Sequence, residues 1–467
     1  MAIVKPSLAK GTRDFSPSEM EKRDYIFRTL KTVFAKYGYR EIQTPSFENL
    51  TTLTGKYGDE GDKLIFKILN SGDYLAKAPV NLLSDKDSVS LIPHVSEKAL
   101  RYDLTVPFAR YVVMHQHEIT LPFKRFQIQP VWRADRPQRG RYREFYQCDV
   151  DVVGSESLLN EAEFILIYHE ALTNLGLTDF TIKLNNRKIL SGIAELLGKP
   201  ELLIPMTVAI DKLDKIGMEG VDKELLERGF SVEELQKLRP IMQLNGPVAT
   251  KIEQLKDILS ASAIGLKGIE EIEIVLGYVE KMTAHTSSIS RFIDLDITLA
   301  RGLNYYTGCI FEVKTNEVTM GSIGGGGRYD DLTGMFGLKG LTGVGISFGA
   351  DRIYDVLEEL GRFPTQTEQS TKVLFSNFDK LSELYALPLL QQLRRSGVAA
   401  EIYPAATKLK KQLTYADAKR IPYVVLIGEE EMQKGLLSLK DMQTGEQRKL
   451  NEADLLTFLT NGYEPLG

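Results

Sequence analysis

Residues 125–151 read RFQIQPVWRADRPQRGRYREFYQCDVD. Two strand-like runs, 125–129 and 144–148, flank a segment in which Pro137 and Gly140 favour a turn, so the stretch predicts a β-hairpin. Five arginines lie within the eleven residues 133–143, and each guanidinium can bind an oxyanion through two hydrogen bonds. We interpret the hairpin as a phosphate-binding element; the alternative is a solvated basic loop. Asp149 and Asp151 follow the second run, where acids can meet a cationic group of a substrate.

The segments around this hairpin predict a chain of several domains. A helix is expected around residues 25–34, an extended edge piece at 41–45, a helix over 158–175 and a strand over 180–184. Residues from about 196 are rich in Leu, Glu, Lys and Ile at helical spacing, and strand-like sequence resumes only at Phe292. We therefore expect a first core part (1–195), a helical insertion (196–285), a second core part (286–365) and a C-terminal domain (371–467). The last of these alternates strand and helix, which predicts an α/β domain with a parallel sheet.

Composition excludes several classes of protein. Of 467 residues, 43 % are hydrophobic and 26 % charged, which excludes wholesale disorder. No apolar run reaches membrane-spanning length and no signal core begins the chain, so a cytoplasmic protein without a membrane partner is expected. Cys148 and Cys309 have no ligand-spaced neighbours, so neither a disulfide framework nor a bound metal is expected. Because the net charge is −5, contact with a nucleic acid requires a local basic patch.

Four further segments carry polar, glycine-rich or basic patterns. Residues 301–308 (RGLNYYTG) combine one cation with two tyrosine hydroxyls. Residues 324–330 (GGGGRYD) and 343–353 (GVGISFGADRI) are dense in glycine, which lets another backbone or a flat ligand approach closely. The second glycine segment is one residue off the dinucleotide fingerprint, and the chain contains no P-loop motif. Residues 394–420 carry seven basic side chains against two acidic ones, which is the patch expected for backbone contact with a nucleic acid.

Over essentially its whole length the sequence resembles the histidyl-tRNA synthetases, a family of class II aminoacyl-tRNA synthetases. Residues 37–45 resemble motif 1, 126–145 motif 2 and 343–353 motif 3, while 100–107 (LRYDLTVP) and 301–308 resemble the histidine-specific signatures. The resemblance implies an α+β fold with an antiparallel-sheet catalytic core, a helical insertion and a C-terminal α/β anticodon-binding domain. It also implies a homodimer formed through motif 1.

The resemblance further implies a role for each motif residue. Arg133 and Arg301 would face the α-phosphate as catalytic cations, and Asp151 and Tyr306 would read the two imidazole nitrogens. ATP would be bound by Arg133, Arg141, Glu144 and Arg352, and L-histidine by Asp103, Thr105, Gln147, Asp151, Tyr305, Tyr306 and Tyr329. Mg²⁺ would enter with ATP as part of the substrate.

The implied reaction has two steps. ATP and L-histidine give histidyl-adenylate and pyrophosphate, and the acyl group then passes to the 3′ end of tRNA(His). Two alternatives are a catalytically silent, synthetase-like regulatory subunit of histidine biosynthesis and a sensor of uncharged tRNA. The complete histidine signatures and the C-terminal domain argue against the first, and the absence of kinase motifs argues against the second. A class I synthetase is excluded because neither H-I-G-H nor K-M-S-K-S occurs.

Overall fold

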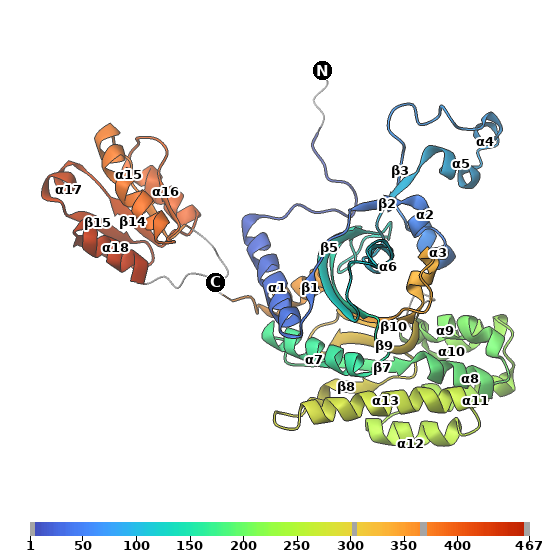
Figure 1. The fold of residues 1–467 in the computed structure, drawn as a ribbon. Helices are drawn as coiled ribbons and strands as arrows, with labels where there is room; N and C mark the ends of the chain where they lie inside the picture. The colour runs from blue at the N-terminus through green and yellow to red at the C-terminus, as the bar shows by residue number, and fades with distance from the viewer. Residues whose placement is uncertain (1–4, 301–305, 365–370, 462–467) are drawn as a thin grey trace. The chain divides into compact units, whose positions relative to one another are not determined.

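An eight-stranded sheet organises the first of the chain's two units, residues 1–364 (Figure 1). The computed structural model describes residues 5–300, 306–364 and 371–461. The strand order is β1-β5-β6-β11-β10-β9-β7-β8, and all pairings except the two outermost ones are antiparallel. The strands are β1 (Arg40–Glu41), β5 (Phe123–Trp132), β6 (Glu144–Val153), β7 (Phe180–Asn186), β8 (Ile293–Leu295), β9 (Tyr306–Thr315), β10 (Gly324–Asp330) and β11 (Thr342–Gly349). The predicted antiparallel core sheet is confirmed.

Helices and a small second sheet complete this unit. The small sheet has the order β2-β4-β3, from β2 (Phe47–Asn49), β3 (Lys67–Ile68) and β4 (Lys98–Leu100). The helices are α1 (Pro17–Lys36), α2 (Leu50–Leu53), α3 (Gly58–Lys63), α4 (Val80–Ser84), α5 (Ser88–Val95), α6 (Thr105–Met114), α7 (Leu159–Asn174), α8 (Arg187–Leu196), α9 (Leu203–Ile210), α10 (Leu213–Glu227), α11 (Val232–Met242), α12 (Val248–Ile258), α13 (Ala263–Met282) and α14 (Ala350–Leu360), with short 3₁₀ turns at Pro200–Leu202, Ser290–Phe292 and Leu332–Phe336. Within the described residues, none of the helices of either unit has the length and apolarity needed to cross a bilayer.

The predicted hairpin is formed by β5 and β6. Ten residues of each strand pair in register, from Phe123 opposite Val153 to Trp132 opposite Glu144. At its tip Gln138 and Arg141 exchange two backbone hydrogen bonds, and Gly140 has a φ of 68°. A positive φ at this position of a tight turn is what favours glycine there. The turn predicted from Pro137 and Gly140 is therefore where the chain reverses.

Helices cover both faces of the large sheet. Cys148, Val150 and Val152 of β6 point to one face, where they join the core made with α1, α7 and α14. On the other face α6 packs on the sheet through Phe108 and Val112. Because side chains alternate along a strand, the neighbours of those buried residues in β6 must face the α6 side. That side carries the polar residues described below.

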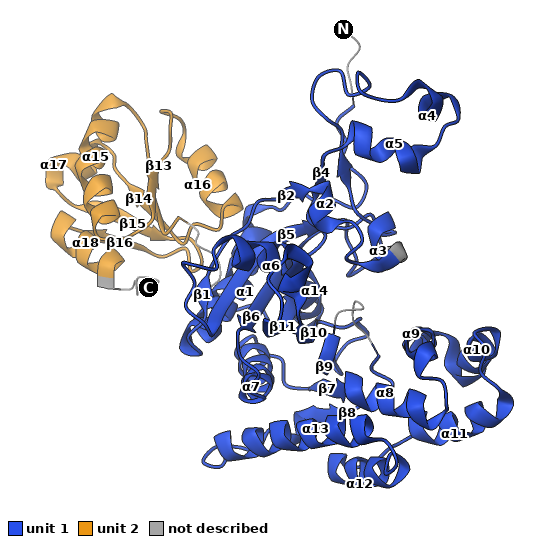
Figure 2. Ribbon diagram, turned by 45° about the vertical axis from the view of Figure 1, so that its right-hand side comes forward, with its two compact units in different colours: residues 1–364 blue, residues 365–467 orange. Residues whose placement is uncertain are grey.

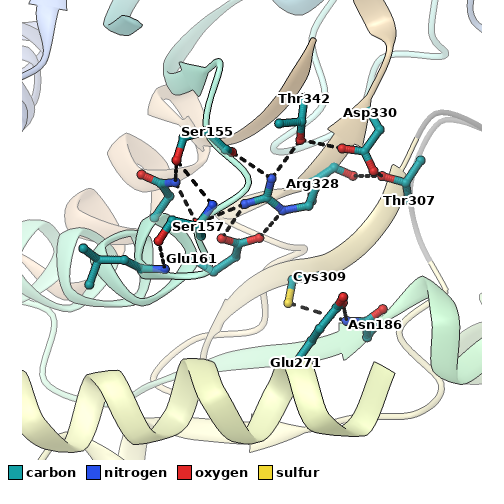
Figure 3. Close-up of polar contacts among 12 residues, drawn as sticks. Ser155, Ser157, Glu161, Asn186, Glu271, Thr307, Cys309, Arg328, Asp330 and Thr342 are labelled. Atoms are coloured by element: carbon teal, nitrogen blue, oxygen red, sulfur yellow. Dashed lines mark hydrogen bonds and ion pairs between the residues drawn. The ribbon is translucent and has the colours of Figure 1, made fainter. Parts of the chain in front are cut away.

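The helical segment predicted at 196–285 contains α9 to α13, and its side chains join the main core without a break. α13 lies beside α8 and β7 (Figures 1 and 2). There the amide of Asn186 at the end of β7 donates a 2.8 Å hydrogen bond to Glu271 of α13 (Figure 3). Lys188 pairs with the same carboxylate. The segment is therefore anchored to the sheet by a buried polar contact as well as by apolar packing.

A buried ion pair joins β10 to α7. Arg328 binds both carboxylate oxygens of Glu161, which is fully buried, and donates further hydrogen bonds to the Ser155 carbonyl and the Thr342 hydroxyl (Figure 3). These contacts engage both sides of the guanidinium fork. They fix the strand end that carries Tyr329, the next residue of β10.

Glu161→Gln is expected to lower the free energy of unfolding of the first unit by about 3–5 kcal/mol, because it leaves a buried cation without its counter-charge. Trp132 is the only tryptophan of the chain, so its fluorescence during urea unfolding reports on this unit. The exposed Glu156 provides the control, since Glu156→Gln should leave the midpoint unchanged. Equal midpoints for the two variants would contradict a stabilising role for the pair.

The second unit, residues 365–467, contains a five-stranded sheet in the order β13-β12-β14-β15-β16. The strands are β12 (Val373–Phe375), β13 (Ala400–Ile402), β14 (Tyr423–Leu426), β15 (Leu437–Asp441) and β16 (Gln447–Leu450), and the helices α15 (Lys380–Arg395), α16 (Leu409–Ala418), α17 (Glu429–Lys434) and α18 (Glu452–Asn461). β13, β12 and β14 are parallel, but β15 and β16 are antiparallel, so the prediction of a parallel sheet was only partly right. A short connection ending at Gly445 (φ 79°) joins the last two strands, and such a connection permits only antiparallel pairing.

Candidate active site

A cavity of about 330 Å³ opens on the α6 side of the large sheet. Its walls come from the start of α6, the β5–β6 hairpin, β6, β9, β10, β11 and the start of α14. Nine of the residues predicted from sequence line it: Asp103, Thr105, Arg133, Arg141, Gln147, Asp151, Tyr306, Tyr329 and Arg352. Arg301 and Tyr305 lie outside the described residues. Glu144 is not among the lining residues, and its carboxylate accepts a 2.7 Å hydrogen bond from the Trp132 indole.

The polar wall of the cavity is one face of β6. Phe145, Gln147, Asp149 and Asp151 line it, which is the every-second-residue spacing of a strand. β11 runs beside this wall with Gly345 opposite Asp151. A Cβ on Gly345 would lie 1.9 Å from Asp151 Oδ1, so any other residue would displace the carboxylate. The glycine density noted in the sequence thus makes room for side chains of the neighbouring strands.

Asp151 is held from two sides. The Tyr329 hydroxyl donates a 2.8 Å hydrogen bond to Oδ1, and Arg125 Nη2 lies 2.8 Å from Oδ2 in an ion pair. Burial raises the pKa of Asp151, and the Arg125 charge opposes that shift. Arg125 itself is fully buried and lies against the Phe108 ring at 4.1 Å. The sequence analysis missed Arg125, although its place opposite Asp151 follows from the hairpin register.

Asp103 and Arg133 meet where α6 begins. Asp103 Oδ1 accepts hydrogen bonds from the backbone N–H of Val106 (3.2 Å) and from the Tyr57 hydroxyl (2.9 Å). Burial raises the pKa of Asp103, and the Arg133 charge opposes that shift. Arg133 Nε donates to the Tyr102 carbonyl at 3.1 Å, and its guanidinium lies 4.3 Å from the Tyr102 ring centroid. The guanidinium is thereby held at the cavity wall.

The five hairpin arginines do not share one task. Arg133 and Arg141 line the cavity, and Arg141 Nε lies 3.5 Å from the Asp135 carboxylate. Arg139 pairs with Glu359 of α14, and Arg143 donates a 3.1 Å hydrogen bond to the Asp135 carbonyl. Two of the five hairpin arginines therefore line the cavity, and phosphate binding by them stays a prediction.

The start of α14 is tied to the hairpin. Arg352 Nε donates to the Gly140 carbonyl at 2.8 Å, and Nη1 donates to the Ser322 carbonyl. The neighbouring Asp351 accepts hydrogen bonds from Arg23 of α1 (2.6 Å) and from the Tyr146 backbone N–H (2.8 Å), and it also pairs with Arg13. These contacts set the position of Arg352 relative to the turn of the hairpin.

No group of three or more His, Cys, Asp or Glu side chains in the described ranges is arranged to hold a metal ion. The oxygen-rich wall of the cavity and its three arginines, Arg133, Arg141 and Arg352, suit a zwitterion and a polyanion.

The sequence profile of the histidyl-tRNA synthetases matches residues 11–78 and 89–353, and that of an anticodon-binding domain matches residues 372–462. The chain belongs to the histidyl-tRNA synthetase family. A histidine–tRNA ligase of Christiangramia forsetii is 60 % identical over 448 residues, which cover 96 % of this chain and 97 % of the relative. A histidine–tRNA ligase of Phocaeicola vulgatus is 56 % identical, and the match covers 98 % of this chain and 99 % of the relative. As a histidyl-tRNA synthetase, the chain is a class II aminoacyl-tRNA synthetase.

Solved structures agree with this family. The crystal structure of a histidyl-tRNA synthetase from Nostoc superposes with a TM-score of 0.81 at 31 % identity, covering 99 % of this chain and all of the other. A Bacillus halodurans protein described as an ATP phosphoribosyltransferase regulatory subunit/histidyl-tRNA synthetase shares the fold. It superposes with a TM-score of 0.70 at 19 % identity, and the match covers 90 % of this chain and 99 % of the other.

Proposed function

We propose that this chain, a histidine–tRNA ligase, activates L-histidine in the cavity and that the residues lining it bind both substrates. The observation that carries the proposal is the gathering of nine residues predicted from the sequence, from separate elements, around one cavity. A carboxylate oxygen of histidine attacks the α-phosphorus of ATP and the bond to pyrophosphate breaks, giving histidyl-adenylate. The acyl group then passes to the 3′ end of tRNA(His).

Arg133 stabilises the negative charge that develops on the α-phosphate oxygens during this attack, and Arg301 supplies a second cation. Support for Arg133 comes from its fixed place beside Tyr102 at the cavity wall. Arg352 and Arg141 bind ATP from the α14 and hairpin sides, because both line the cavity and Arg352 is bonded to the hairpin turn. Glu144 is proposed at the ATP end from the family resemblance, and its hydrogen bond from Trp132 holds it where the hairpin loop joins the two strands.

Asp103, Thr105 and Gln147 bind the α-ammonium group of histidine, whereas Asp151 and Tyr306 bind its ring nitrogens. Tyr329 orients Asp151 through its hydrogen bond, and Tyr305 lines the pocket by resemblance. Such a pocket provides a hydrogen-bond partner for each polar group of histidine. When another amino acid enters, these protein groups stay without a partner, and this cost selects strongly against the wrong amino acid.

Asp151→Asn is expected to raise the KM for histidine about 10- to 100-fold and to leave the KM for ATP within about twofold, because a lost charged hydrogen bond costs about 1.5–3 kcal/mol. A carboxylate only accepts hydrogen bonds, whereas an amide can present its NH₂ group to the ring N–H. Tyr329→Phe, which keeps the carboxylate and removes only its donor, should produce a smaller rise. A raised KM for ATP with an unchanged KM for histidine would contradict this role.

Mg²⁺ enters with ATP and neutralises phosphate charge when bound. The cavity fits such an ion, because magnesium takes one or two carboxylates besides phosphate oxygens and the lining carboxylates include Asp135 and Glu312.

The C-terminal unit (371–467) binds the anticodon region of tRNA(His), and 196–285 acts as an insertion domain of a core made from 1–195 and 286–365. Support for the first point comes from the anticodon-binding profile and from the exposure of all seven basic residues at 394–420. Two chains associate through the motif 1 segment, residues 37–45, which contains the edge strand β1. We place the protein in the cytoplasm, where the buried thiols Cys148 and Cys309 stay reduced.

The regulatory-subunit alternative has less support. The relatives of high identity are histidine–tRNA ligases, whereas the Bacillus halodurans protein is only 19 % identical. ATP–pyrophosphate exchange measured with each of the twenty amino acids tests the proposal. Exchange that depends on histidine alone supports it, and the absence of exchange with every amino acid would favour the silent alternative.

A further inference from the structure

Five buried acceptor oxygens of the cavity-lining residues receive no hydrogen bond within the described part of the chain. Asp151 is ion-paired with Arg125 and Glu312 with Lys314, which leaves Asp103 Oδ2, Gln147 Oε1 and Asp149 Oδ1. Burying an acceptor without a donor costs free energy, so such atoms inside a binding cavity point to donors on a ligand. Two of the three residues belong to the predicted set for the substrate's ammonium group, and Asp149 does not.

Ser347 of β11 sets the orientation of Gln147 and Asp149. It lies directly opposite Asp149 in the sheet and is hydrogen-bonded to that carboxylate. Ser347 Oγ also lies 3.2 Å from Gln147 Nε2. A hydroxyl has one hydrogen, and an ionised carboxylate can only accept, so Ser347 donates to Asp149 and accepts from the Gln147 amide. This arrangement turns Gln147 Oε1 away from Ser347 and leaves Asp149 with one oxygen for another donor.

The number and charge of these atoms match an ammonium group. An –NH₃⁺ group has three donors and no acceptor, and two of the three acceptors belong to carboxylates. Arg125, the buried cation whose charge acts on Asp149, is already paired with Asp151. A bound ammonium would therefore satisfy three buried oxygens and offset part of the charge of the three carboxylates Asp103, Asp149 and Asp151, which have two cations, Arg133 and Arg125, acting on them.

We propose that Asp149 Oδ1 binds the α-ammonium group of the substrate histidine together with Asp103 Oδ2 and Gln147 Oε1, and that Ser347 is the positioning residue for this triad. The inference rests on the proposed function, because it assigns a further contact for the same substrate. It adds one substrate-binding residue and one positioning residue to those expected from the family signatures.

The electrostatics of Asp149 make this contact sensitive to pH. Burial, together with the charges of Asp151 and Asp103, raises the pKa of Asp149 to about 7, while the Arg125 charge and the Ser347 hydrogen bond oppose the shift. The other ionisable groups whose charges couple to Asp149 are Cys148 on the same strand, Arg101 after β4 and Tyr168 on α7. As the pH falls below this value Asp149 takes up a proton, which removes the negative charge that attracts the ammonium group and competes with its N–H donors for the carboxylate oxygens. Histidine binding should therefore weaken in this range.

Asp149→Asn, which keeps the size of the side chain, tests the contact. The KM for histidine in pyrophosphate exchange is expected to rise about 10- to 100-fold, the range for loss of one charged hydrogen bond, with the KM for ATP unchanged. Binding of two analogues identifies the group that is contacted. Affinity for histidinol, which keeps the ammonium group, should fall by a similar factor, while affinity for 3-(imidazol-4-yl)propionate, which lacks it, should not change.

Ser347→Ala and Asp222→Asn complete the set. Ser347→Ala should raise the KM for histidine by a smaller factor, because both acceptors remain but lose their orientation. Asp222 is a buried carboxylate of α10 that pairs with Arg239 and does not line the cavity, so Asp222→Asn should leave both KM values unchanged. The unfolding midpoint from Trp132 fluorescence shows whether each variant is folded.

The pH profile gives a second readout. Between about pH 8 and pH 6 the KM for histidine of the wild-type protein should rise more steeply than that of Asp149→Asn, and comparison of the two cancels the titration of the substrate itself. Three results would each overturn the inference: a folded Asp149→Asn protein with an unchanged KM for histidine, an equal loss of affinity for both analogues, or pH profiles of the wild-type and variant proteins that run in parallel. Failure of the wild-type protein to catalyse histidine-dependent exchange would instead overturn the proposed function.

Discussion

Arg133→Ala is expected to slow histidyl-adenylate formation by about 10²- to 10³-fold, the loss found when one fixed donor to a developing charge is removed. The attacking carboxylate and the α-phosphate both carry negative charge, and charge on the phosphate oxygens must be stabilised as the bond forms. Arg133 is the hairpin arginine held at the cavity wall beside the start of α6. Its guanidinium contacts Tyr102 through Nε and the aromatic face, so the side chain is held by a residue outside the hairpin.

The hairpin provides its own control for this experiment. Arg136 lies three residues further along, is exposed and does not line the cavity, so Arg136→Ala should leave the rate within about twofold. Single-turnover formation of the adenylate measures the chemical step directly. Similar rates for the two alanine variants would contradict the role of Arg133. Arg301→Ala, which the family resemblance motivates, should reduce the same rate to a comparable extent.

Removing the C-terminal unit is expected to abolish efficient tRNA charging while histidine-dependent pyrophosphate exchange continues. A truncated chain that ends at Pro364 keeps every residue proposed to bind ATP and histidine, because all of them belong to the first unit. It loses the segment 394–420 and the whole anticodon-binding match. Phosphate contacts supply much of the affinity of a nucleic-acid complex, so the charging efficiency (kcat/KM for tRNA) should fall at least about 100-fold.

A charge variant of the full chain separates loss of contact from loss of the domain. Lys408, Lys410 and Lys411 are exposed at the start of α16, and replacing all three with alanine should raise the KM for tRNA without changing pyrophosphate exchange. The full chain should also lose more tRNA affinity on addition of salt than the truncated chain does. Equal charging by the full and truncated chains would show that the basic patch is only a solvated helix face.

Local sequence patterns were sufficient to predict much of the secondary structure. The turn at Pro137 and Gly140, the two strands beside it and the helix over 158–175 follow from propensity and spacing, and the structure has them as β5, β6 and α7. The antiparallel pair β15–β16 was missed because no strand was assigned after residue 427. The turn ending at Gly445 was the signal that could have revealed it.

For the candidate site, too, some features could be predicted from the sequence and others depend on the tertiary structure. The sequence by itself determined which residues could do the chemistry, because the motifs carry their residue types and strand alternation puts Gln147, Asp149 and Asp151 on one face. Only the tertiary structure decided that two of five hairpin arginines line the cavity, that Arg125 lies beside Asp151 and that Ser347 joins Asp149 to Gln147. The reason is physical. Side-chain direction along a strand is a local property of the backbone, whereas the partner of a buried charge is set by the register of strands and by which neighbours exclude water from it.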